Sequence, residues 1–144
     1  MTDTATETKI LTDTREQLPY DFEGATETAL KTGDYSVEGL ENQVAVERKT
    51  RNDLLSCIGQ ERERFERELE RLSEFDLAVV MVEANFRDML NLPEWSELTP
   101  SQVGGSILAW IAKYQVVFFF AGSRKVGERA TQKILKKFQK YENE

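Results

Sequence analysis

Two short runs of consecutive apolar residues limit the possible fold more than any other feature of this chain. The run "LAVVMV" lies within residues 76–85, and "VVFFFA" spans residues 116–121. A membrane-spanning helix needs about 20 apolar residues, so runs of this length predict buried β-strands. Helical patterns lie on both sides of each run, and we therefore expect a sheet that is covered by helices.

Three main helices are expected around these strands. A long helix over residues 52–75 is predicted by apolar residues at three- and four-residue spacing, which form one stripe on a helix face. Thr99 is a predicted N-cap, with Pro100 at the first position of the next helix, and Ser123 is the predicted N-cap of a closing helix. The stripe of the long helix contains Leu55, Ile58, Phe65, Leu69 and Leu72.

The first 50 residues predict strands. A strand over residues 9–13 is followed by two extended segments that meet at a Gly33–Asp34 turn, and residues 44–49 show period-two alternation. Three strands joined by short turns indicate an antiparallel meander. The predicted fold is therefore α/β, a mixed β-sheet flanked by helices, over residues 9–144, and a flexible arm is expected at residues 1–8.

The absence of histidine from all 144 residues restricts the chemistry. Ser–His and Cys–His catalysis, His-containing zinc sites and a histidine general base are excluded. The single cysteine, Cys57, is expected to be a small buried hydrophobic residue. Acid–base and metal chemistry must come from Asp, Glu, Lys, Arg and Tyr.

Charge is unevenly distributed along this acidic chain. The net charge is −7, yet residues 99–144 carry more basic than acidic side chains. This acidity argues against non-specific nucleic-acid binding by the whole surface. A polar, acidic N-terminus without a secretory signal, together with a single cysteine, indicates an intracellular protein, cytoplasmic or nucleoid-associated, without membrane contact.

Charged residues at the end of the 44–49 strand are the strongest candidates for a functional site. Residues two apart on a strand share a face, so Glu47 and Lys49 point one way and Arg48 the other. A hairpin brings Asp34 beside Glu47, and Asp13, at the end of the first strand, could join them. Carboxylates about 4 Å apart repel by roughly 4 kcal/mol per pair at an effective dielectric constant near 20. Without His or Cys ligands, carboxylate oxygens favour Mg²⁺ or Mn²⁺.

Two interpretations of these charges remain open at the level of residue types. One is a surface hairpin with scattered charges, because Glu-x-Lys is a common sequence. The other is metal-dependent hydrolysis of a phosphodiester. In that reaction the Lys49 ammonium would orient the attacking water or stabilise charge on the phosphate.

The spacing of these residues resembles a family signature. Gly33–Asp34 is followed by Glu47–Lys49 and, after three more residues, by Asp53, which is similar to the G-D-x(n)-E-R-K-x(3)-D motif of the XPF-type structure-specific endonucleases. Upstream, residues 13–16 (Asp-Thr-Arg-Glu) resemble the D-x-R-E element of that family. The resemblance covers residues 9–83, and the order of the expected elements agrees to the C-terminus.

The resemblance implies the restriction-endonuclease-like fold of the PD-(D/E)XK superfamily and metal-dependent incision of branched, forked or flapped DNA in repair or recombination. Carried over by position, Asp34 and Glu47 would bind Mg²⁺ or Mn²⁺, with Asp13 as a further acidic ligand. Lys49 would position the water. Arg48, on the opposite face, would support the site, and its main-chain carbonyl is a further candidate ligand.

Four more residues have candidate supporting roles. The resemblance implies that Arg15 contacts a phosphate, while Glu16 either supports the site or caps a turn. Asp53 either supports the metal ligands or complements the dipole of the following helix. Arg62 falls on the apolar stripe of the long helix. We favour a guanidinium that faces the acidic cluster or a scissile phosphate over an arginine that only extends its charged end to solvent.

The last helix carries a basic stripe with two interpretations. Such a stripe is usually the solvated face of an amphipathic helix, but its segregation within an acidic chain also fits a track for the DNA backbone. The basic stripe consists of Lys125, Arg129, Lys133, Lys136 and Lys140, and the residues expected on the buried side are Val126, Ala130, Ile134, Phe138 and Tyr141.

Larger members of the resembled family carry additional DNA-binding domains, which this sequence lacks. Duplex binding is therefore expected to depend on a homodimer, on the C-terminal helix or on a partner protein. The expected dimer contact lies at Ile107, Leu108, Trp110 and Ile111. Two alternatives remain open. One is a catalytically inert DNA-binding or assembly module, and the other is a nuclease of the same fold that acts on linear DNA or RNA.

Overall fold

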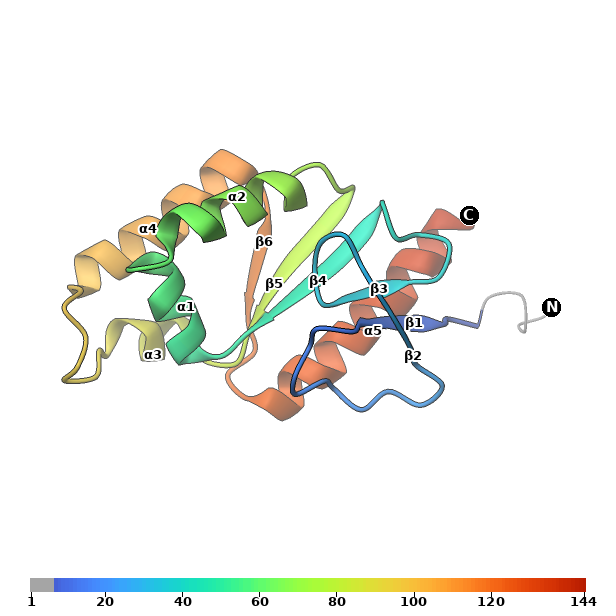
Figure 1. The fold of residues 1–144 in the computed structure, drawn as a ribbon, viewed down its shortest axis with the longest axis horizontal. Helices are drawn as coiled ribbons and strands as arrows, with labels where there is room; N and C mark the ends of the chain where they lie inside the picture. Colours follow the sequence, from blue (N-terminus) through green and yellow to red (C-terminus); the bar gives the residue numbers. More distant parts are fainter. Residues whose placement is uncertain (1–6) are drawn as a thin grey trace.

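Within residues 7–144, which the computed structural model describes, six β-strands form one mixed sheet covered by five α-helices (Figure 1). The strands lie in the order β2-β1-β3-β4-β5-β6. This arrangement confirms the expected α/β class, a mixed sheet flanked by helices. The strands are β1 (Ile10–Asp13), β2 (Thr26–Thr28), β3 (Tyr35–Val37), β4 (Val44–Lys49), β5 (Leu77–Val82) and β6 (Val117–Phe120).

Side-chain caps begin four of the five described helices. Thr99 accepts a hydrogen bond from the Gln102 N–H, and Ser123 accepts one from the Val126 N–H, so both predicted N-caps are confirmed. Pro100 is the first residue of its helix, where its missing N–H costs no hydrogen bond. The helices are α1 (Arg51–Ile58), α2 (Arg62–Leu72), α3 (Phe86–Leu90), α4 (Pro100–Tyr114) and α5 (Arg124–Glu142).

The expected three-strand meander is only partly correct. β3 pairs antiparallel with both β1 and β4, as a meander requires. Between β1 and β3, however, the chain forms the short strand β2, which pairs parallel with β1 at the outer edge of the sheet. β2 holds three polar residues that are mostly exposed, and such side chains suit a sheet edge that faces water.

The helix expected over residues 52–75 is divided in two. α1 ends at Ile58, Gly59 is its C-cap, and α2 begins at Arg62. Glycine is a poor helix former, because its backbone loses more entropy on ordering than that of other residues. The break redirects the chain, so that α1 and α2 are separate helices on the same side of the sheet (Figure 1).

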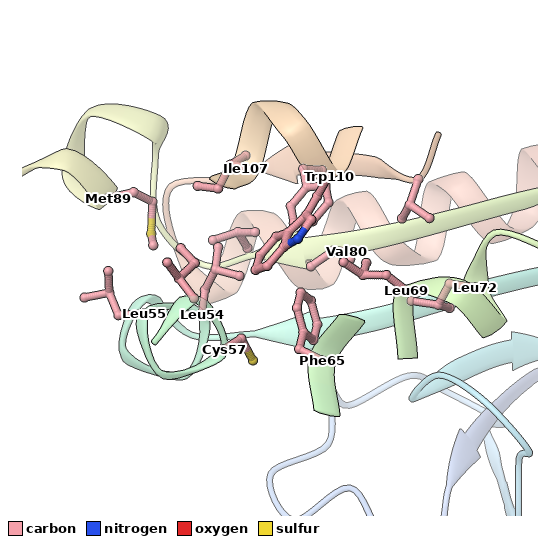
Figure 2. Close-up of a cluster of buried hydrophobic side chains, with 14 of the residues drawn as sticks. Leu54, Leu55, Cys57, Phe65, Leu69, Leu72, Val80, Met89, Ile107 and Trp110 are labelled. Atoms are coloured by element: carbon pink, nitrogen blue, oxygen red, sulfur yellow. The ribbon is translucent and has the colours of Figure 1, made fainter. Parts of the chain in front are cut away.

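The larger hydrophobic core lies between the sheet and helices α1 to α4. Figure 2 shows Trp110 of α4 beside Phe65 of α2, and their ring centroids are 5.2 Å apart in an edge-on arrangement. The Trp110 indole N–H donates to Glu66 Oε2 at 2.9 Å, which satisfies its polar edge. Cys57 is buried in this core, as expected for a small hydrophobic residue.

α5 covers the opposite face of the sheet with a side that only partly matches the expected one. The expected residues that do pack against this second core are Ala130, Ile134 and Phe138. Gly127, Thr131 and Leu135 are its buried residues, whereas Val126 and Tyr141 are exposed. The small and polar residues at two of the buried positions allow close packing on the sheet. Hydropathy alone does not identify them as buried.

The N-terminal arm expected at residues 1–8 falls mostly outside the described part of the chain, because residues 1–6 are not described. The Thr8 hydroxyl donates to Gln139 Oε1 at 2.6 Å, which ties the start of the described chain to α5. In residues 7–144, no helix combines the length and the apolar character that a membrane crossing requires.

Thr131→Val is expected to increase the free energy of unfolding by about 1 kcal/mol. Thr131 is fully buried, and its hydroxyl oxygen has no hydrogen-bond partner in the described part of the chain. Valine has nearly the same shape and removes the cost of burying an unpaired hydroxyl. The urea midpoint should rise without a change in slope. Thr26→Val, on the exposed edge strand, is the control, and an equal gain there would contradict the prediction.

Candidate active site

The end of β4 places two charged side chains on the face that α1 and α2 cover. Ala45 packs in the core beneath these helices, and Glu47 and Lys49 follow it on the same face at two-residue steps. The Lys49 ammonium Nζ lies 3.4 Å from Glu47 Oε2. Glu47 is only 7% exposed, so its carboxylate is removed from most of the solvent.

Asp34 is held against the end of β4 by backbone pairing. Its N–H donates to the Val46 carbonyl at 2.9 Å, and its Oδ2 accepts from the Arg48 main-chain N–H at 2.8 Å. The preceding Gly33 has a φ of +87°, and a Cβ there would lie 3.0 Å from the Ala45 Cβ. Glycine tolerates both the left-handed backbone and this close approach, which explains the Gly-Asp pair.

Burial and neighbouring carboxylates raise the pKa values of both carboxyl groups. Burial raises the pKa of Asp34 to about 7, and the negative charge of Glu16 adds to the effect. The pKa of Glu47 is raised well above its usual range, first by burial and then by Asp34 and Glu68. Burial would lower the pKa of Lys49, but the neighbouring Glu47 outweighs it, and the net shift is upward. The ammonium group therefore stays charged.

Glu68 of α2 is a site residue that sequence reasoning missed. Its carboxyl group raises the pKa of Glu47, and it lines a cavity of about 270 Å³ together with Glu47 and Lys49. In α2 it lies three residues after Phe65 and one before Leu69, both of which are buried. A position at the margin of a buried helical stripe was the signal that could have identified it.

Asp13 does not join Asp34 and Glu47 as a third ligand. Its carboxylate accepts hydrogen bonds from Arg15 Nε at 2.9 Å and from the Leu30 N–H at 2.8 Å. Burial would raise the pKa of Asp13, but these hydrogen bonds outweigh it and lower the pKa. In the described part of the chain, no three acidic or cysteine side chains are grouped closely enough to hold a metal ion. The expected three-carboxylate set is therefore wrong.

Arg15 extends from Asp13 into the open side of the site. Its Nη2 donates to the Leu30 carbonyl at 2.6 Å, yet its side chain is 70% exposed. It lines a cavity of about 720 Å³ with Asp34, Glu47 and Lys49.

Asp53 lines the same cavity from the first turn of α1. Its main-chain N–H donates to Thr50 Oγ1 at 3.1 Å, the hydrogen bond that caps the helix. The cavity thus combines exposed charged groups with carboxylates that are withdrawn from water.

The Arg48 side chain lies on the opposite face of β4 from Glu47, as strand alternation predicts. Arg48 Nε donates to Glu83 Oε2 at 2.9 Å, and Arg48 Nη1 lies 3.5 Å from Glu16 Oε1. All three side chains are at most 9% exposed. Glu16 also accepts from the Tyr35 hydroxyl at 3.2 Å, so it belongs to a buried network rather than to a turn cap.

Arg62 faces α4 instead of the carboxylates. Its Nη1 donates to Ser106 Oγ at 2.8 Å and to the Ile58 carbonyl at 3.2 Å, and its Nε lies 3.3 Å from Glu66 Oε2. The guanidinium carbon also lies 4.9 Å from the centre of the Trp110 ring. The expectation that Arg62 contacts the acidic cluster is wrong, because the break after α1 starts a new helix with Arg62 in its first turn.

The expected dimer contact on α4 is also partly wrong. Ile107 and Trp110 are buried in the larger core, whereas Leu108 and Ile111 are exposed. The four residues were expected to share one contact surface, but the helical repeat divides them between the core and the outside.

The basic stripe lies on the outer side of α5, where all five of its residues are exposed. α5 packs on the sheet face opposite to the one that carries Glu47 and Lys49. The sheet therefore separates the basic stripe from these two residues.

The donor set at the end of β4 fits a hard divalent cation. Asp34 and Glu47 both offer carboxylate oxygens beside one cavity. Mg²⁺ commonly binds one or two carboxylates and keeps several waters, and Mn²⁺ accepts the same ligand type. Such a cation would also offset the repulsion between the two carboxylates. These two residues therefore fit the expected Mg²⁺ or Mn²⁺.

The fold is that of the XPF-type nuclease domain. A structure described as XPF from Aeropyrum pernix matches with a TM-score of 0.68 and 16% sequence identity, over 94% of this chain and 65% of the other. A structure of XPF from Aeropyrum pernix in complex with DNA matches with a TM-score of 0.72 and 18% identity, over 93% of this chain and 66% of the other. At such identities the likeness shows the fold alone.

The family is shown by the sequence itself. The ERCC4 domain matches residues 13–137, which is most of the chain. The chain belongs to the ERCC4 domain family, and its resemblance to the XPF-type endonucleases is confirmed. No curated protein sequence matches the chain significantly.

Asp34→Asn is expected to stabilise the metal-free protein more at pH 8 than at pH 5. The pKa of Asp34 rises from 3.8 to about 7 on folding, so the folded state binds this proton more tightly than the unfolded state. The stability that this group contributes is fully present below about pH 4 and is lost as the pH rises through 7. Asparagine is neutral at every pH and still accepts from the Arg48 N–H.

In EDTA, we expect the variant to gain about 1–3 kcal/mol more free energy of unfolding at pH 8 than at pH 5. Urea titrations at both pH values measure this difference. Glu38→Gln, which neutralises an exposed carboxylate, is the matched control. A gain for Asp34→Asn that is the same at both pH values would contradict the prediction.

Proposed function

We propose that this chain is a divalent-metal-dependent DNA endonuclease that hydrolyses phosphodiester bonds, with residues 9–144 as its nuclease domain. The observation that carries the proposal is the pair of carboxylates, Asp34 and Glu47, beside Lys49 at one open cavity. Holding two like charges away from water is costly, and a metal site for a charged substrate is a reason to retain them. Membership of the ERCC4 domain family supports the same activity.

In the proposed hydrolysis, the acidic residues of the site would bind the metal ion, and the basic residues would contact the water and the phosphate. When bound, Mg²⁺ or Mn²⁺ supplies Lewis acidity for the phosphate and its attacking water. Asp34 and Glu47 would hold the ion, and the Lys49 ammonium would orient the water or stabilise charge on the phosphate. Arg15 presents an exposed guanidinium suited to a phosphate oxygen. Glu68 lines the adjoining cavity beside Glu47 and adds negative charge near the ion.

Branched, forked or flapped DNA is the proposed substrate, in repair or recombination at an intracellular, cytoplasmic or nucleoid-associated location. One protein of the same fold is described as XPF in complex with DNA, which supports DNA as the nucleic acid. Exposed cations at the cavity, Arg15 and Arg64, suit a phosphate backbone.

With Mg²⁺ or Mn²⁺, the wild-type protein is expected to cut fork or 3′-flap DNA near the junction. Asp34→Ala removes a metal ligand and Lys49→Ala removes the ammonium group, and each should lower the cleavage rate about 10²–10³-fold. Denaturing gels of end-labelled fork, 3′-flap, single-stranded and plain duplex DNA measure these rates. Lys113→Ala removes an exposed ammonium from α4, away from the carboxylates, and is the matched control.

Each other result of this assay has a definite meaning. Cleavage of linear duplex or of RNA without preference for a junction would assign a different substrate to the same fold. No cleavage with any divalent metal would favour a catalytically inert DNA-binding or assembly module. Equal cleavage by wild type and by both variants would exclude Asp34 and Lys49 from the reaction.

Homodimerisation is the proposed route to duplex binding, with a protein partner as the alternative. On β6, the free edge strand opposite β2, Val117 and Phe119 are exposed. Leu108 and Ile111 are exposed on α4, which packs against the same strand. Ser106 of α4 accepts a hydrogen bond from Arg62 of α2, so the Ser106 side of α4 faces α2. Each residue turns the helix by about 100°, which places Leu108 and Ile111 on the side of α4 that faces away from α2. Phe118 packs under α4, so by strand alternation Val117 and Phe119 point to the other face of β6. We call the four exposed residues that border this sheet edge on its two faces the edge surface.

Phe119→Glu is expected to convert a dimer into a monomer, because it places a charge on the edge surface. Sedimentation equilibrium should give twice 16.6 kDa for wild type and 16.6 kDa for the variant. Thr26→Glu, on the opposite edge strand, should remain dimeric. A monomeric wild type would overturn this proposal and leave the partner protein as the route to duplex binding.

A further inference from the structure

We propose that Glu83 is a positioning residue that fixes one wall of the site cavity. The site wall is the segment Arg15–Leu18, whose four residues all line the cavity of about 720 Å³. Glu83 directly follows β5, and its carboxylate lies on the α5 side of the sheet, away from Glu47 and Lys49. The inference rests on the proposed function, because it assigns the site wall to DNA contact.

Glu83 joins side chains from three separate parts of the chain. Its Oε2 accepts from Arg48 Nε at 2.9 Å and from the Tyr20 hydroxyl at 2.7 Å, and Arg124 Nη1 lies 3.9 Å away. The Glu83 side chain is only 7% exposed. The Glu83 carboxylate therefore restrains its partners strongly. If one of these contacts breaks, a charged or polar group is left unpaired in a low-dielectric environment.

The partners of Glu83 anchor the site wall at both of its ends. Arg48 holds Glu16 at the first end, with 3.5 Å between Nη1 and Oε1. Tyr20 lies just beyond the second end, where its ring stacks on Tyr35 with centroids 5.2 Å apart and its N–H donates to the Tyr35 hydroxyl at 2.7 Å. The orientation of both anchors depends on their bonds to Glu83.

α5 completes the support of the site wall. Arg124, its first residue, donates to the Leu18 and Pro19 carbonyls, both at 2.9 Å. A Cβ at Gly127 would lie 2.6 Å from the Tyr20 hydroxyl oxygen, so the helix approaches this network as closely as a glycine allows. Arg124 therefore reaches both Glu83 and the backbone of the site wall.

The metal ligands are held by different interactions. Asp34 is fixed by its backbone bonds to Val46 and Arg48, and Glu47 lies on a central strand that pairs with β5 along its length. Weakening Glu83 should therefore loosen the site wall and its exposed Arg15 while the two carboxylates stay in place. A loss of DNA affinity without a loss of metal affinity distinguishes positioning from a general structural role.

Glu83→Gln and Tyr20→Phe test the proposal. The amide leaves Arg48 paired with Glu16, and phenylalanine keeps the ring stack on Tyr35, so both variants are expected to fold. Glu70→Gln, on the exposed side of α2, is the matched control.

Three measurements define the expected result. Hydrogen exchange of residues 16–21 in the free protein should become about fivefold faster or more in both variants. Mn²⁺ affinity should change less than about twofold, and the affinity for fork DNA, measured in EDTA, should fall about 3–10-fold. In an Arg15→Ala background the Glu83→Gln change should cause no further loss of DNA affinity, because both act through the same side chain.

Each contrary outcome overturns a defined part of the proposal. Unchanged exchange, or a loss that adds fully to that of Arg15→Ala, would overturn the positioning of the site wall. An equal fall in Mn²⁺ and DNA affinity would show a general structural role and would also overturn it. A wild-type protein that binds neither Mn²⁺ nor DNA would overturn the proposed function itself, and the exchange rates would still decide whether Glu83 holds the site wall.

Discussion

The structure of the site depends on the placement of two like charges side by side and away from water. Burial raises the pKa values of Asp34 and Glu47, and nearby carboxylates add to the effect, Glu16 for Asp34 and Asp34 for Glu47. The Arg48 N–H and the Lys49 ammonium offset only part of this cost. Both carboxylates are fixed by strand pairing instead of by a mobile loop, so they cannot separate to relieve their repulsion. A fixed geometry of this kind is what a metal ion needs, because its ligands must be in place before it binds.

Strand alternation divides the chemistry of β4 between its two faces. Glu47 and Lys49 point into the cavity under α1 and α2, while Arg48 points toward α5 and meets Glu16 and Glu83. Three consecutive charged residues therefore do not compete for the same space. Arg48, which lies between Glu47 and Lys49 in the sequence, pairs with Glu16 and Glu83 instead. It therefore stays buried and does not neutralise Glu47. Because each face holds charges of opposite sign, the Glu-Arg-Lys run costs less than three charged side chains on one face would.

Periodicity and capping signals predicted the fold well. The wrong predictions concern side chains whose positions depend on contacts between distant segments. Apolar runs identified β5 and β6, Thr99 and Ser123 capped their helices as expected, and alternation placed the side chains of β4 correctly. The break at Gly59 was not predicted, because a single glycine inside a helical pattern is often tolerated. That break redirected Arg62 toward α4. Asp13 was misjudged because its partners, in a local turn and a distant loop, leave no periodic signal.

α5 affects the site through its first turn, and this limits what the basic stripe can do. Among the described residues, Arg124 at the start of the helix contacts both Glu83 and the backbone of the site wall. Lys136 and Lys140 lie about 18 and 24 Å further along the helix, at 1.5 Å per residue. Over such distances, screening at physiological salt leaves these lysines little direct influence on Arg124 and the network around Glu83. We therefore expect these two lysines to contribute to DNA binding only by contacting the phosphate backbone themselves, whereas Arg124 contacts Glu83 and the backbone next to the cavity.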